Sequence, residues 1–115
     1  MARILSVSYD VSLLTTREFI LKQMGHEVVS ALGFTHSLQH CQRGHFDLFI
    51  LGHSIPIADK EALIAAFRVT CNGPVLALKR PDEAPVRGAD YETEPQPEKV
   101  VALVEQITSR KVAAD

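Results

Sequence analysis

Short apolar runs alternate with amphipathic stretches along the whole chain, without internal repeats or low-complexity tracts. This alternation is typical of βαβ units, in which helices connect parallel strands. Residues 47–51 form the most continuous apolar run, so they are predicted to form a central strand that is buried on both faces. In all, the apolar runs predict five strands, at residues 3–7, 26–31, 47–51, 74–78 and 89–92.

Four helices are predicted around these strands. The first begins after Asp10, whose side chain can cap the first turn, and ends at Gly25. Two more cover about residues 35–42 and 57–70. The last is marked by apolar residues at i, i+3, i+4 and i+7, namely Val100, Leu103, Val104 and Ile107.

The connection between the fourth and fifth strands is too short for a regular crossover helix. It has the sequence KRPDEAPVRG at positions 79–88, whereas a helical crossover takes at least about 10–12 residues. Pro81 and Pro85 also remove backbone donors and disfavour helical geometry in the residues before them. We therefore predict a loop here, with the fourth crossover helix shortened or missing.

Composition narrows the class of protein. With 115 residues and 46% hydrophobic content, the chain is predicted to form one domain over residues 1–115. Its 12 basic and 14 acidic residues leave a net charge of −2 without a basic stripe, so neither nucleic acid nor a membrane surface is expected as a partner. No apolar run approaches the roughly 20 residues that span a bilayer, and the N-terminus lacks a signal-peptide pattern. A cytoplasmic location is expected.

Two side-chain clusters raise the question of metal binding or catalysis. His36, His40, Cys41 and His45 include imidazoles at helical i, i+4 spacing, but no acidic partner accompanies them, so neither a metal site nor a cofactor is expected. Ser8, Tyr9 and His53 lack an evident carboxylate to orient the histidine, and we do not expect an enzyme. Cys41 and Cys71 lie far apart without a CxxC pattern, which favours reduced thiols.

Five segments together carry a family resemblance. The segments RILSVSYDVSLL, GHEVVSA, FDLFILGHSIP, PVLAL and GADYETEP, read in order, resemble the response-regulator receiver domain of two-component signalling along nearly the whole chain. The resemblance implies a flavodoxin-like α/β fold: a three-layer sandwich with a five-stranded parallel sheet in the order 2-1-3-4-5. Its active site would lie at the carboxyl ends of the strands.

The resemblance also shows which functional residues are missing. A receiver needs a carboxylate to form an aspartyl phosphate, and Gly52 stands at that position. Ser8 and Tyr9 replace the two acids that hold Mg²⁺. Lys79 replaces the Thr or Ser after the fourth strand, and Glu94 replaces the Lys that precedes a proline after the fifth. His53 or Ser54 could still accept a phosphoryl group from a kinase, but without a metal site beside them.

The altered positions generate two structural hypotheses. Lys79 and Glu94 leave neighbouring strands and are expected to form a salt bridge that fills the old phosphate site. The shortened connection exposes one sheet face, so either the loop at 80–87 folds back over it or a second chain covers it as a homodimer. In the family that the chain resembles, this region is an interaction surface. The candidate contact residues here are Tyr91, which is expected to be exposed, Arg80, Asp82 and Arg87.

The sequence therefore favours a stand-alone pseudo-receiver, a response-regulator-like protein of phosphorelay signal transduction that acts through protein–protein interaction without being phosphorylated. Its partner would be a signalling protein or a second copy of the chain. A first alternative is a small-molecule sensor that uses the emptied pocket around Gly52, Ser8, Tyr9 and His53. A second is a response regulator that is phosphorylated unconventionally.

Overall fold

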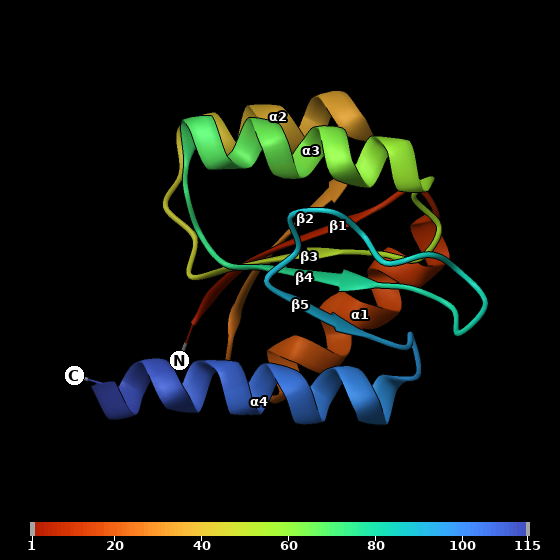
Figure 1. The fold of residues 1–115 in the computed structure, drawn as a ribbon. Coiled ribbons are helices and arrows are strands. Elements are labelled where there is room, and N and C mark those ends of the chain that lie inside the picture. The colour runs from red at the N-terminus through yellow and green to blue at the C-terminus, as the bar shows by residue number, and fades with distance from the viewer. Residues whose placement is uncertain (1, 115) are drawn as a thin grey trace.

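Strands and helices alternate through the chain (Figure 1). The structure, a computed structural model, describes residues 2–114, and the side chains of residues 2–109. The strands are β1 (Arg3–Ser8), β2 (Glu27–Leu32), β3 (Leu48–Leu51), β4 (Val75–Leu78) and β5 (Tyr91–Thr93). The helices are α1 (Val11–Gln23), α2 (Phe34–Arg43), α3 (Ile57–Thr70) and α4 (Pro97–Ala114).

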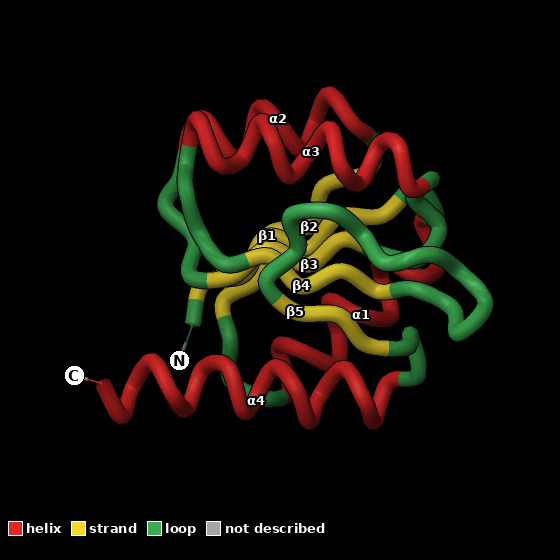
Figure 2. The backbone as a smooth tube through the Cα atoms, in the orientation of Figure 1, coloured by secondary structure: helices red, strands yellow, loops and turns green. Residues whose placement is uncertain are grey.

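The strands form one parallel sheet in the order β2-β1-β3-β4-β5, which confirms the predicted flavodoxin-like topology. Helices α2 and α3 cover one face of the sheet, and α1 and α4 cover the other (Figures 1 and 2). No helix within residues 2–114 is long and apolar enough to cross a membrane.

Most element boundaries lie within one or two residues of the predictions, and the largest shift is at β5, which begins at Tyr91 rather than at residue 89. The cause is Asp90, whose carboxylate accepts hydrogen bonds from the Val75 backbone N–H and from Arg68, both at 2.7 Å. These contacts hold residue 90 in a turn. The predicted N-cap is confirmed, because the Asp10 side chain accepts from Ser12 and Leu13. The C-cap is Met24, and Gly25 follows it with a φ of 90°.

The two faces of the sheet carry separate hydrophobic cores, because successive side chains on a strand point to opposite faces. Leu5, Val7, Phe49 and Leu51 pack under α2 and α3. Even-numbered residues point the other way, and the cluster on the α1 and α4 side contains Ile4, Leu48, Ile50, Leu76 and Leu78. A side chain at position 52, one step beyond β3, would follow Ile50 toward α1.

The connection between β4 and β5 contains no helix in the structure, as predicted, and folds back over the sheet on the α3 side (Figure 1, cyan). Val86 is only 5% exposed and joins the core under α3. The loop backbone is tied to α3 by hydrogen bonds from Arg87 N–H to Glu61 and from Arg68 to the Gly88 carbonyl. The loop itself therefore covers the face that lacks a helix, which is the first of the two predicted alternatives.

Cys41 and Cys71 form a disulfide, so the prediction of reduced thiols is wrong. Their separation of 30 residues in sequence obscured their proximity in space. Because α2 and α3 lie side by side and both run antiparallel to the strands, their carboxyl ends meet at the same edge of the sheet. The two Cα atoms are 5.9 Å apart, within the range that a disulfide spans.

We predict that this disulfide contributes about 3–4 kcal/mol to the free energy of unfolding, since it closes a loop of roughly 30 residues in the unfolded chain. Urea unfolding with and without a thiol reductant should show a lower midpoint for the reduced protein. The double variant Cys41→Ser/Cys71→Ser is the control and should be insensitive to the reductant. Equal midpoints for the oxidised and reduced protein would contradict the prediction.

Candidate functional site

The carboxyl ends of β1, β3, β4 and β5 meet at one edge of the sheet, where the resemblance places the active site. Val7 pairs with Leu51, and Leu51 pairs with Ala77 in β4. The structure brings Ser8, Tyr9 and Gly52 together at this edge through contacts with Ser54 and the Val7 carbonyl. Lys79 and Glu94 follow the next two strands and make their contacts elsewhere.

The position beside Gly52 is occupied by a cation, the guanidinium of Arg17 from α1. Arg17 Nη1 donates to Ser6 Oγ at 3.0 Å and to the Val7 carbonyl at 3.1 Å. A Cβ atom on residue 52 would lie 2.6 Å from Arg17 Nη2 and 3.1 Å from the Val7 carbonyl oxygen. A side chain at this position would therefore require the guanidinium to move and would crowd the Val7 carbonyl.

Arg17 is buried without a counter-charge. It is 8% exposed, and none of its hydrogen-bond or ion-pair partners in the part of the chain that the structure describes is a carboxylate. Burial lowers the pKa of Arg17 to about 10, because desolvation disfavours the charged form. The sequence held a signal that was missed: Leu14, Arg17 and Leu21 recur at i, i+3 and i+7, on the buried face of α1.

A second buried cation, Lys60, lies near the same edge and was also missed. Lys60 is 1% exposed and comes from the first turn of α3, and its Nζ donates to the Leu78 carbonyl at the end of β4 at 2.7 Å. Desolvation lowers its pKa. Helices α1 and α3 also point their positive N-terminal ends toward this edge. Two buried cations and two helix N-termini therefore lie at this edge, and they disfavour Mg²⁺ beside Gly52.

Hydroxyl groups take the place of the metal-binding acids. Ser8 Oγ lies 3.0 Å from Ser54 Oγ, which also accepts from the Tyr9 backbone N–H at 3.1 Å. The Tyr9 hydroxyl donates to Asp59 at 2.8 Å. Burial and the Asp59 carboxylate raise the pKa of Tyr9 to about 12. This network and Arg17 lie against Gly52, where the emptied pocket was expected.

The prediction of a salt bridge between Lys79 and Glu94 is wrong. Lys79 Nζ donates to the Glu83 carbonyl within its own loop, at 3.1 Å. Glu94 instead pairs with Lys99 in the first turn of α4, at 2.9 Å. The hydrogen bond from Lys99 lowers the pKa of Glu94. Lys79 and Glu94 thus each bond to a partner that is nearer in the sequence. The peptide bond between Glu94 and Pro95 is trans.

The candidate interaction residues lie on or beside the loop between β4 and β5. Arg80, Asp82 and Arg87 are exposed, and their side chains make no hydrogen bond or ion pair with the described residues. Tyr91 was expected to be exposed, but it is half-buried because it points from β5 toward α4 and packs on that core. Of the four candidate contact residues, the three on the loop are therefore more exposed than Tyr91.

The histidine cluster of α2 does not converge on a common point. The Cys41 sulfur is bound in the disulfide, and no group of three or more His, Cys, Asp or Glu side chains in residues 2–109 is arranged to hold a metal ion.

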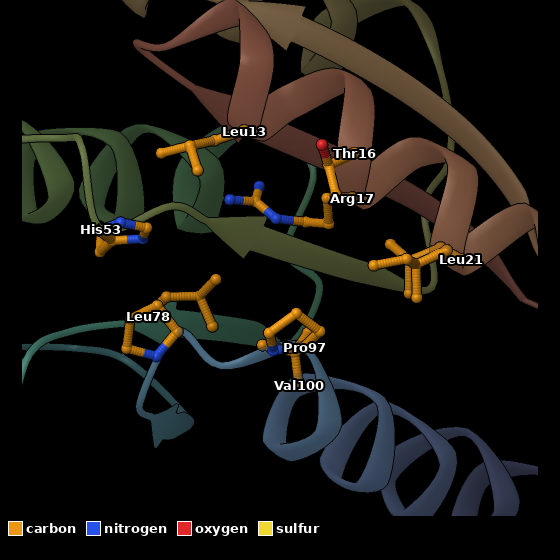
Figure 3. A pocket seen from close by; sticks show the side chains of 10 residues that line it. Leu13, Thr16, Arg17, Leu21, His53, Leu78, Pro97 and Val100 are labelled. Atoms are coloured by element: carbon orange, nitrogen blue, oxygen red, sulfur yellow. The ribbon is translucent and has the colours of Figure 1, made fainter.

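A cavity of about 170 Å³ lies beside the site, between α1 and α4 (Figure 3). Arg17 and His53 line it, together with Thr16 and a mainly apolar wall. His53 Nδ1 is buried and has no hydrogen-bond partner among the described groups. The wall consists of Leu13, Ile20, Leu21, Leu78, Pro95, Pro97 and Val100.

Comparison with solved structures confirms the fold implied by the resemblance. A response regulator from Clostridium difficile superposes with a TM-score of 0.84 at 18% identity, over 96% of this chain and 98% of that one. The receiver domain of Francisella response regulator 1452 gives 0.81 at 16% identity over 100% of both chains. TrrA of Thermotoga maritima, in complex with Mg²⁺-BeF, gives 0.79 at 18%, over 93% and 99%. The chain thus has the receiver fold of two-component response regulators.

The likeness is one of structure rather than of sequence. No protein-family model matches the chain, and no curated protein matches it significantly.

We predict that the pKa of His53 lies below its ordinary value of 6.5 and rises in the Arg17→Met variant. Burial is the main cause of the lowered pKa, and the positive charges of Arg80, Arg17 and Lys60 add to it. Removing the Arg17 charge removes one of these repulsions. The measurement is the pH titration of the His53 imidazole resonances by NMR.

The native chain should also lose stability in acid through this group. Because the folded state binds the His53 proton more weakly than the unfolded chain does, this stability is present above pH 6.5 and decreases as the pH falls through the folded-state pKa.

Arg43→Met, which alters an exposed arginine on α2, is the matched control and should leave the His53 pKa unchanged. An unchanged His53 pKa in Arg17→Met would place the guanidinium away from this histidine.

Proposed function

We propose that this protein is a pseudo-receiver in signal transduction, which acts through protein contacts and without phosphoryl transfer at the strand ends. The observation that supports this most directly is the Arg17 guanidinium packed against Gly52. By the resemblance, that position belongs to the carboxylate that accepts the phosphoryl group. Here it has neither a nucleophile nor the space for one while Arg17 keeps its two hydrogen bonds.

Phosphoryl transfer to a carboxylate also requires Mg²⁺ to offset the phosphoryl charge. Asp10 and Asp59, which follow β1 and β3 in the chain, are already engaged: Asp10 caps α1, and Asp59 accepts the Tyr9 hydroxyl. The buried cations Arg17 and Lys60 would repel a divalent ion. The arrangement is therefore unfavourable for each component of receiver self-phosphorylation, and we propose that the domain is not an enzyme and uses no cofactor.

The other candidate acceptors are poorly placed for direct phosphorylation. Ser54 Oγ is held between Ser8 and the Tyr9 N–H. His53 is half-buried with Nδ1 enclosed. A kinase would have to disrupt this packing to reach either group. These contacts weigh against the alternative of an unconventional phosphorylation.

The interaction surface that fits this function is the loop between β4 and β5. Its backbone is fixed to α3 and to Glu92, while Arg80, Asp82 and Arg87 remain exposed. Here Val86 is buried in the core, which supports a surface with one fixed shape. The partner would be a signalling protein or a second copy of the chain, and homodimerisation stays a prediction.

We predict that the protein does not respond to Mg²⁺ followed by beryllofluoride, a mimic of the aspartyl phosphate. In amide NMR spectra of the labelled full chain, the resonances of Ser8, Gly52 and Lys79 should keep their positions at millimolar Mg²⁺ with beryllofluoride in excess. The physical reason is that no free carboxylate lies at Gly52 to bind beryllium.

TrrA of Thermotoga maritima, whose structure contains Mg²⁺-BeF, provides the positive control under the same conditions. Saturable shifts centred on Gly52 would contradict the proposed function, since they would require a carboxylate to replace Arg17 at this position.

A further inference from the structure

We propose that the cavity between α1, α4 and the carboxyl ends of β3 and β4 is a binding site for a small carboxylate with an apolar body, and that Arg17 pairs with the carboxylate. This site is separate from the Ser8, Tyr9 and Ser54 network, none of whose members line the cavity. Arg17 is shared by the two sites, because its guanidinium both packs against Gly52 and lines the cavity.

The buried charge of Arg17 is the first argument. A buried ion without a partner is unfavourable, because it has lost its hydration without gaining a counter-charge. Nη1 has two neutral acceptors, whereas neither Nη2 nor Nε has an acceptor within the described residues. The side chain extends across the cavity toward His53 (Figure 3). An anion in the cavity would supply the missing charge, and the planar guanidinium matches a carboxylate in shape.

The neighbouring His53 strengthens the polar end of the site. It lines the cavity, and its Nδ1 is the one buried side-chain nitrogen or oxygen of the described chain without a hydrogen-bond partner. A neutral imidazole can donate one hydrogen bond to a carboxylate oxygen. Two groups of the same cavity thus lack partners that one ligand could provide.

The walls and the size define the rest of the ligand. Seven of the ten lining residues are apolar, from Leu13 on α1 to Val100 on α4. A cavity of about 150 Å³ with apolar walls holds a benzene molecule, and this one measures about 170 Å³. A single aromatic ring or a short branched chain with one carboxylate therefore fits, whereas a nucleotide does not. Thr16 is exposed and marks where the cavity reaches the surface.

The test uses the full chain, with benzoate and 3-methylbutanoate as probes and benzamide as the uncharged analogue of benzoate. Amide NMR titrations at constant ionic strength should show saturable shifts at Arg17, His53, Leu78 and Val100 with at least one of the carboxylates. The dissociation constant should be at least about tenfold higher for benzamide than for benzoate, because one charge-assisted pair is lost.

Variants separate the contributions of charge and shape. Arg17→Met should weaken binding at least about tenfold, as should Val100→Phe, which fills the cavity. Arg43→Met, on the opposite side of the sheet, is the matched control and should bind like the native chain. If Arg17→Met does not fold, the comparison of benzoate with benzamide on the native chain decides the role of charge.

Three results would overturn the proposal. The first is the absence of saturable shifts at the cavity with both carboxylates. The second is equal binding of benzoate and benzamide, which would show that Arg17 does not recognise the charge. The third is the same set of shifts with sodium chloride alone, which would indicate a general anion effect without an apolar subsite.

Discussion

The close contact between the Arg17 guanidinium and Gly52 is the constraint on which the rest of the site depends. It ties α1 to the ends of β1 and β3, because Nη1 donates to Ser6 Oγ and to the Val7 carbonyl. It also leaves no room for a side chain at position 52 while the guanidinium keeps its place. Because this cation is buried at the strand ends, a cluster of acids that binds Mg²⁺ is unfavourable there. The other groups at this edge of the sheet are hydroxyl groups and a second buried cation, Lys60.

Much of the architecture could be predicted from the sequence, because it follows from local patterns. Alternating apolar runs predicted the parallel sheet, and Pro81 and Pro85 predicted the missing helix. The remaining features depend on contacts between distant segments. The helical spacing places Arg17 on the buried face of α1 but does not show that its charge lies beside Gly52, and Cys41 meets Cys71 only because two helices end at the same edge. The predicted bridge between Lys79 and Glu94 does not form. Lys79 bonds to the Glu83 carbonyl and Glu94 pairs with Lys99, and each partner is nearer in the sequence.

The packing differs between the α3 side and the α1 side of this sheet edge, and the difference suits a signalling domain that does not use phosphoryl transfer. On the α3 side, Val86 and the hydrogen bonds from Arg68 to Gly88 and Asp90 hold the loop between β4 and β5 against the core. On the α1 side, packing is less complete, and a cavity remains between α1 and α4. A fixed surface for a partner and a small internal site can coexist, because they lie on opposite faces of the sheet.

The measurement that tests this account most directly is a double-mutant cycle for Gly52→Ala and Arg17→Met, followed by urea unfolding. If the guanidinium lies against residue 52, the new methyl group should destabilise the native chain by about 1–3 kcal/mol through overpacking. Most of that cost should disappear when Arg17 is already methionine, which leaves a coupling free energy of about 1 kcal/mol or more. Additive effects, within about 0.5 kcal/mol, would show that Arg17 does not occupy the place beside Gly52 and would contradict the account.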